Sequence, residues 1–152
     1  MSRWRGIDAC GALPKGEEFD WFAVDARGCV GHFSTAGFGP LPSRLLERLD
    51  GGRRDAVWNL GARILALPVI GTATVHLRGE RGDWLAQARR GLFSYDWRHW
   101  KGPYRRAATP DLPVLLEDLP SDIRELLGLV TWPELRFARE RRIRPERLEP
   151  CG

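Results

Sequence analysis

The sequence predicts an α+β fold: a single domain with a largely antiparallel sheet, an N-terminal β-hairpin and helices packed on one face. Three observations lead to this class. The chain has 152 residues, of which 43% are hydrophobic, and this suits one domain with a packed core. Most strand-like segments follow one another directly, and helical patterns occur only in the middle and near the end. We expect the domain to span residues 1–138, with an extended lead-in at 1–17 and a basic, flexible tail at 139–152.

The hairpin is the element that the sequence indicates most directly. Residues 19–25 read FDWFAVD and residues 29–34 read CVGHFS, and both segments are rich in residues that favour strands. Between them, Asp25 and Gly28 are typical of a turn, because Asp bonds nearby backbone N–H groups and Gly adopts positive φ. Both faces of the first strand are apolar, so we expect a central strand rather than an edge.

The later elements follow from periodicity and from glycine and proline breaks. Val57, Leu60 and Ile64 form an apolar helical stripe that Pro68 ends. Gly91 is placed to stop another helix, and Pro120 suits the start of one. The expected helices are 43–49, 55–66, 84–90 and 120–127, and the expected strands are 69–77, 92–97, 104–108, 113–116 and 135–138.

The net charge of +4 is concentrated at the C-terminal end. The chain has 24 Lys and Arg against 20 Asp and Glu, and residues 136–152 alone contain six arginines and three glutamates. Without a clustered basic face, this balance does not by itself indicate a nucleic-acid-binding protein. No run approaches the roughly 20 apolar residues of a membrane helix. The three cysteines show no CxxC spacing, so we expect a protein of the reducing cytoplasm that does not associate with membranes.

No motif predicts a catalytic, metal or cofactor site, and we expect no cofactor. Cys29 and His32 have ligand-like spacing, but positions i and i+3 of a strand point to opposite faces. We therefore interpret them as a buried Cys and a partly exposed His. Ser34 lacks the Gly-x-Ser-x-Gly context of a nucleophile, and no phosphate-binding glycine pattern occurs. An enzyme with a pocket near Asp96 and His99 stays open as a minor alternative.

Aromatic and basic residues alternate between residues 97 and 106. Such a mixture is typical of protein interfaces, of nucleic-acid-binding surfaces and of a solvated loop around one core tryptophan. We expect the protein to bind a protein partner, and nucleic acid is the alternative partner, bound through this loop and the arginine-rich tail. The candidate partner-binding residues are Phe38, Arg98, His99, Trp100, Lys101, Tyr104, Arg105 and Arg106.

The overall pattern resembles a family of small bacterial α+β proteins, most of them uncharacterised. The shared features are an aromatic strand closed by a D-x-x-G turn, a YDW-type strand and a P-x-x-P segment followed by DLP, within residues 17–138. The residues that carry the resemblance are Trp21, Asp25, Gly28, Phe33, Gly37, Gly39, Pro40, Tyr95, Asp96, Tyr104, Pro110, Pro113 and Pro120. The hairpin is also loosely similar to the opening strands of immunity proteins. That similarity implies a non-enzymatic protein that blocks a partner toxin sterically, and it implies no catalytic residue.

Overall fold

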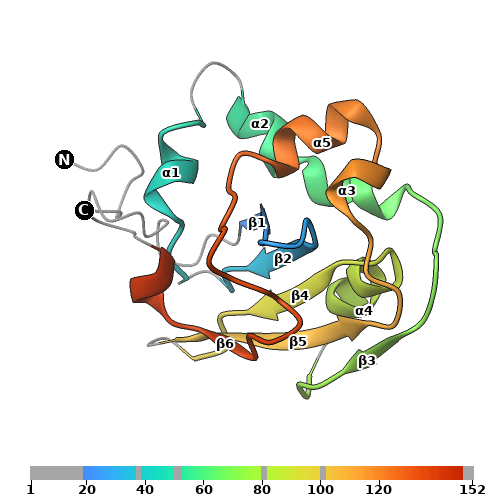
Figure 1. The fold of residues 1–152 in the computed structure, drawn as a ribbon. Coiled ribbons are helices and arrows are strands. Elements are labelled where there is room, and N and C mark those ends of the chain that lie inside the picture. Colours follow the sequence, from blue (N-terminus) through green and yellow to red (C-terminus); the bar gives the residue numbers. More distant parts are fainter. Residues whose placement is uncertain (1–18, 37–38, 50–52, 80–81, 100–101, 149–152) are drawn as a thin grey trace.

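A six-stranded sheet forms the centre of the protein, with helices around it (Figure 1). The structure, a computed structural model, describes residues 19–36, 39–49, 53–79, 82–99 and 102–148. The strands are β1 (Asp20–Val24), β2 (Val30–Ser34), β3 (Ala73–Val75), β4 (Phe93–Asp96), β5 (Tyr104–Pro110) and β6 (Arg142–Ile143). The helices are α1 (Ser43–Leu46), α2 (Arg53–Trp58), α3 (Leu60–Leu65), α4 (Gly82–Arg89), α5 (Ser121–Leu127) and the 3-10 turns η1 (Leu116–Asp118) and η2 (Pro145–Leu148). The α+β prediction is confirmed.

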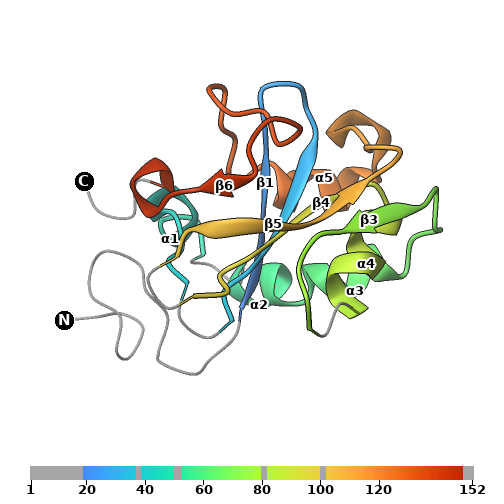
Figure 2. The same ribbon diagram turned by 90° about the horizontal axis from the view of Figure 1, so that it is seen from below.

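The sheet is mixed, because one of its pairings is parallel. Its order is β1-β2-β4-β5-β3, with β6 also paired to β5. β2 and β4 run parallel, since the long connection through α1 to α4 returns the chain in the same direction. The pairings of β1 with β2, and of β5 with β3, β4 and β6, are antiparallel. β3 and β6 pair with opposite ends of β5 on the edge that β4 leaves open (Figure 2).

The turn between β1 and β2 is held by one buried carboxylate. Oδ1 of Asp25 accepts the backbone N–H groups of Arg27 and Cys29, both at 2.9 Å. Gly28 has φ +83°, which glycine adopts without steric cost. Oδ2 accepts the N–H of Phe137 at 2.8 Å. The predicted turn role of Asp25 is therefore confirmed, and its second oxygen also fastens a segment 112 residues further along the chain.

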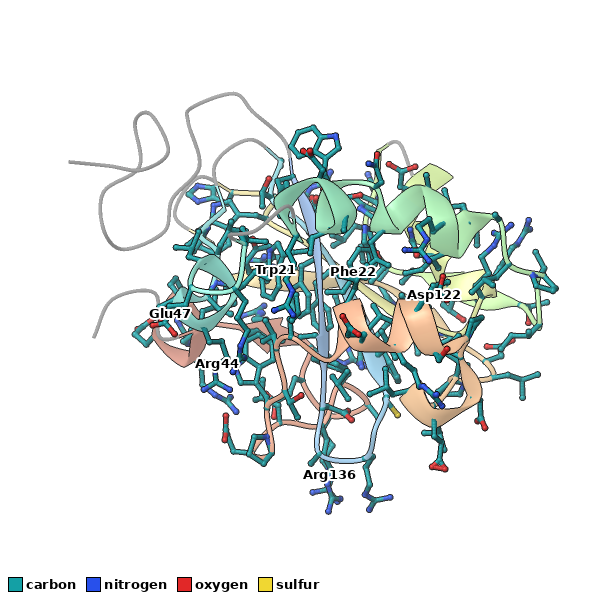
Figure 3. The ribbon with its side chains drawn as sticks, turned by 90° about the horizontal axis from the view of Figure 1, so that it is seen from above. Trp21, Phe22, Arg44, Glu47, Asp122 and Arg136 are labelled. Atoms are coloured by element: carbon teal, nitrogen blue, oxygen red, sulfur yellow. The ribbon has the colours of Figure 1, made fainter. Side chains whose placement is uncertain are left out.

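Both faces of the sheet are packed, but the prediction of a central first strand is wrong, because β1 lies at one end of the strand order. Trp21 and Phe22 point to opposite sides of β1 (Figure 3). On the Trp21 side, Phe33 stacks on Trp21 with ring centroids 4.2 Å apart and on Tyr95 at 4.9 Å. On the other side, Phe22 packs in a cluster with apolar residues of α3 and α5. The sheet is thus the middle layer between two hydrophobic clusters.

The helices do not all lie on one face. α3, α4 and α5 cover the face that carries Phe22, through Leu60 and Ile64, Trp84 and Ala88, and Ile123 and Leu127. The other face is covered by α1 and by residues 129–148. These residues turn back across the sheet because the Asp25 carboxylate and the open edge of β5 accept their backbone groups.

Apart from elements whose ends shift by up to three residues, four predicted elements differ in extent or type. The helix predicted over 55–66 is divided at Asn59 into α2 and α3. The strand predicted over 69–77 is reduced to β3, because its ladder with β5 begins only at Ala73 and Pro110. The strand predicted at 113–116 gives way to η1, with a single bridge between Leu115 and Cys29. Residues 135–138 form no strand, since the N–H of Phe137 bonds the Asp25 carboxylate rather than a neighbouring strand.

Residues 139–148, predicted to be part of a flexible tail, pack on the core through two of their side chains. They form β6 and η2, and Ile143 and Leu148 are completely buried in the cluster around Trp21. The hydroxyl of Tyr95 donates to the backbone carbonyls of Phe137 and Glu140. Ile143 and Leu148 stand among arginines in the sequence, so no apolar pattern indicates that they are buried.

Candidate functional site

Three polar side chains are linked by hydrogen bonds on the face of the sheet that α3, α4 and α5 cover. Nε2 of His32 lies 3.1 Å from Oδ2 of Asp20, and Nδ1 of His32 lies 2.7 Å from Oγ of Ser94. A carboxylate only accepts hydrogen bonds, so Nε2 carries a proton. His32 and Ser94 are fully buried, whereas the side chain of Asp20 is 34% exposed. The prediction of a buried Cys29 and a partly exposed His32 is wrong, because His32 is fully buried and Cys29 is half-buried. Partial burial raises the pKa of the Cys29 thiol.

The three side chains are of the types found in serine hydrolases, but their order of access is inverted. A nucleophilic Ser must reach its substrate, with His and Asp behind it. Here Ser94 is fully buried, as is His32, and Asp20 is the member that meets solvent. The linked side chains therefore fix the orientation of Asp20 and do not present a nucleophile.

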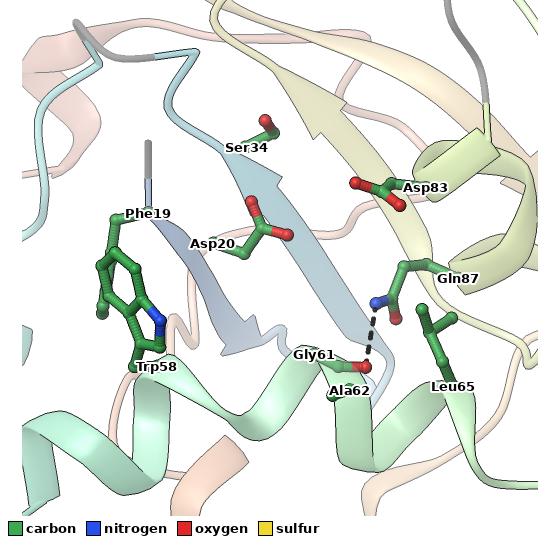
Figure 4. A pocket seen from close by; sticks show the side chains of 9 residues that line it. All are labelled: Phe19, Asp20, Ser34, Trp58, Gly61, Ala62, Leu65, Asp83 and Gln87. Atoms are coloured by element: carbon green, nitrogen blue, oxygen red, sulfur yellow. Dashed lines mark hydrogen bonds between the residues drawn. The ribbon is translucent and has the colours of Figure 1, made fainter. Parts of the chain in front are cut away.

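Asp20 opens into a cavity of about 350 Å³ between the sheet and the helices (Figure 4). α2 and α3 form one wall, and the first turns of α4 form another. The described residues that line it are Phe19, Asp20, Ser34, Trp58, Gly61, Ala62, Leu65, Asp83 and Gln87. The lining is acidic and aromatic, and none of these residues carries a positive charge.

Sequence reasoning missed this cavity, because its residues come from five separate elements. One signal was present: Asp20 stands between Phe19 and Trp21 at the start of a strand that is apolar on both faces. A carboxylate in such a place needs a partner, and His32 supplies it across the hairpin. The contribution of α4 through Asp83 and Gln87 depends on tertiary packing that the local sequence does not indicate.

Tyr104, predicted as a partner-binding residue, is instead a core residue. It is fully buried, accepts the indole N–H of Trp21 at 3.1 Å and donates to the carbonyl of Pro40 at 3.0 Å. Burial raises the pKa of its hydroxyl well above the usual value, so the group stays protonated. Gly39 permits this packing, since a Cβ there would lie 2.5 Å from the Tyr104 hydroxyl. The assignment of Tyr104 to an exposed surface is therefore wrong.

Three other predicted residues do lie together. Arg98, His99 and Arg105 line an open hollow of about 740 Å³, together with Leu77 and Gly102. Arg98 and His99 are exposed, and the Arg98 guanidinium donates to the carbonyl of Arg78. Asp96 is not among the described residues of this hollow and is nearly buried.

Arg106 occupies a second, smaller hollow at the gap between β3 and β6. His76 and Arg141 line it with Arg106. Arg106 also donates to the carbonyl of Phe137 at 2.6 Å, and its guanidinium lies 5.9 Å from the ring centroid of Phe93, so it has a structural role too. Partial burial first, and then the charges of Arg106 and Arg141, lower the pKa of His76.

We use the name basic surface for these residues together with Arg142, and it comprises two separate hollows, because the consecutive strand residues Arg105 and Arg106 point to opposite faces of the sheet. Its residues are His76, Arg98, His99, Arg105, Arg106, Arg141 and Arg142. Arg105 and Arg142 are direct partners in the antiparallel pairing of β5 and β6. Like charges in that arrangement repel each other. On its other side Arg105 lies opposite Asp96 in β4, which offsets part of this charge.

The remaining predicted residues Phe38, Trp100 and Lys101 lie outside the described part of the chain. Within that part, no cluster of three or more His, Cys, Asp or Glu residues is arranged to hold a metal ion. None of its helices has the length and apolar character needed to cross a membrane.

Comparisons with known proteins found no matching family model, no similar curated protein and no similar solved structure. The resemblance to small bacterial α+β proteins and to immunity proteins thus stays a prediction from the sequence.

Proposed function

We propose that this chain is a non-enzymatic protein-binding module whose basic surface docks on an acidic surface of a partner protein. The observation that carries the proposal is the pairing of Arg105 with Arg142 across β5 and β6, beside the exposed Arg98. Repelling charges at one edge of a sheet reduce stability, and an anionic partner would relieve that repulsion. The apolar Leu77 in the same hollow adds a contact that excludes water.

Blocking a partner sterically requires a rigid surface more than a catalytic group. β5 is rigid, because it pairs on both edges and its first residue, Tyr104, is buried in the core. An immunity protein that covers the active site of a toxin would act in this way, and the sequence resemblance favours that role. The partner would present Asp and Glu side chains to the basic surface, since arginine pairs well with carboxylates.

Nucleic acid is the second candidate partner, and the arginines favour it. Binding of single strands usually adds aromatic stacking to phosphate contacts. Trp97 and Tyr104, the described aromatics nearest these arginines in sequence, are buried in the core. These two side chains cannot stack on bases, so the described aromatics add no support for nucleic acid beyond that of the arginines.

Affinity capture with charge-reversed variants tests the proposal. The test variant is Arg98→Glu with Arg142→Glu, since both side chains are exposed. The control is Arg27→Glu with Arg89→Glu, two exposed arginines in the hairpin turn and in the last turn of α4, with the same change in net charge. Tagged proteins are incubated with extract of the source cells, with and without nuclease treatment, and bound proteins are quantified by mass spectrometry.

We expect one stoichiometric partner with the wild type and with the control, and its loss with the test variant. Retention of the partner by the test variant would contradict the proposal. Recovery that disappears after nuclease treatment, together with steep salt dependence, would favour the nucleic-acid alternative instead.

A further inference from the structure

The acidic cavity has the composition of a binding site for a small organic cation. Two carboxylates, Asp20 and Asp83, line it, and the described lining residues include no cation. His32 donates to Oδ2 of Asp20 at 3.1 Å and holds that side chain at the cavity. The other oxygen of Asp20 and both oxygens of Asp83 are acceptors that a ligand with N–H groups would use.

Gln87 provides an independent indication of a missing donor. Its side chain lines the cavity, although the residue is only 2% exposed. Oε1 of Gln87 has no hydrogen-bond partner among the residues that the structure describes, and its Nε2 makes only a long 3.5 Å contact to the carbonyl of Gly61 (Figure 4). A buried amide oxygen without a partner is costly, and an N–H group of a ligand that reached Gln87 would reduce this cost.

An aromatic wall completes the site. Trp58 is 48% exposed although it is a large apolar residue, and its ring lies 5.3 Å from that of Phe19, centroid to centroid. Indole faces attract ammonium and guanidinium groups. A metal ion would need more oxygen or nitrogen ligands than the two carboxylates, and no suitable cluster occurs in the described ranges. These observations favour an organic cation over a metal ion.

We propose that the cavity lined by Asp20, Asp83, Gln87 and Trp58 binds a small primary amine, with its ammonium group between the carboxylates and its alkyl chain against the aromatic wall. The site is separate from the basic surface, and its proposed ligand has the opposite charge to the proposed partner surface.

Titration of the ¹⁵N-labelled protein with 1,5-diaminopentane tests this inference. We expect saturable shifts of the Trp58 indole N–H and of the amides of α4, and no such shifts with 1,5-pentanediol, a neutral molecule of similar length. Calcium chloride at the same concentration should leave these signals in place. No response to the diamine up to about 10 mM, an equal response to the diol, or a response to calcium instead would each overturn the proposal.

Two variants locate the binding site. Asp83→Asn removes one exposed carboxylate and should weaken diamine binding at least about tenfold, which corresponds to about 1.4 kcal/mol. Gly61→Leu places a side chain toward Asp20 and Gln87 and should abolish binding by filling the cavity. A Cβ at this position would lie 3.7 Å from Nε2 of Gln87 and 3.9 Å from Oδ2 of Asp20, at ordinary contact distance. Glu125→Gln, an exposed acid on α5, is the control and should bind like the wild type. Unchanged affinity in Asp83→Asn would overturn the assignment even if Gly61→Leu failed to fold.

Discussion

At the scale of single residues, Asp25 connects the hairpin turn to the C-terminal half of the chain. Its carboxylate accepts three backbone N–H groups, from Arg27, Cys29 and Phe137. We expect Asp25→Ala to lower the free energy of unfolding by about 2–3 kcal/mol, because the donors lose their acceptor and Phe137 is buried. Urea denaturation measures this change. The exposed Asp122, paired with Arg63 on the surface, is the control, and its replacement by Ala should cost less than about 1 kcal/mol. Equal losses in the two variants would contradict the assigned role.

The pKa of His76 depends on the positive charges of the basic surface. Partial burial and the cations of Arg106 and Arg141 lower its pKa, which favours the neutral imidazole. Arg141→Ala removes one of these cations and should raise the pKa of His76 toward its usual value. An NMR titration of the imidazole protons measures the shift, with Arg147→Ala as control because Arg147 pairs with Glu140 instead. An unchanged or lower pKa in Arg141→Ala would show that His76 does not sense this surface.

At the scale of elements, β6 and η2 complete the core rather than forming a flexible end. Leu148 is fully buried, so Leu148→Ala should lower the free energy of unfolding by about 2–5 kcal/mol through lost burial and a residual cavity. Leu112 is 57% exposed, and its replacement by Ala should change stability by no more than about 0.5 kcal/mol. Thermal or urea denaturation of both variants checks this pair. A negligible effect of Leu148→Ala would indicate that residues 139–148 are not packed on the sheet.

Elements with local signals were predictable, and those that depend on distant partners were not. The turn at Asp25 and Gly28 and the ends of α4 follow from residues a few positions apart. The burial of Ile143 depends on the open edge of β5, a contact some 40 residues away in sequence. Tyr104 was assigned to the surface because charged residues surround it, whereas its position on β5 points it into the core.

At the scale of the whole molecule, two regions with different lining residues carry opposite charge. The basic surface lies along β5 and β6, and the acidic cavity lies between the sheet and α2, α3 and α4. Net charge alone did not predict this arrangement, because the chain has nearly equal numbers of acidic and basic residues. The arginines at 98 and 105 were singled out from the sequence, but their neighbours His76 and Arg141 come from other segments that only the fold brings close. A partner that recognises one region need not affect the other.

Hydrogen–deuterium exchange of the chain with and without its captured partner would show whether the basic surface is the docking surface. We expect slowed exchange in peptides covering residues 76–79, 97–99, 104–106 and 141–143, which carry or adjoin the basic surface, and no change in the hairpin turn at 25–29. Slowed exchange at the turn, with residues 97–99 and 141–143 unchanged, would place the partner elsewhere and contradict the proposed role of the basic surface.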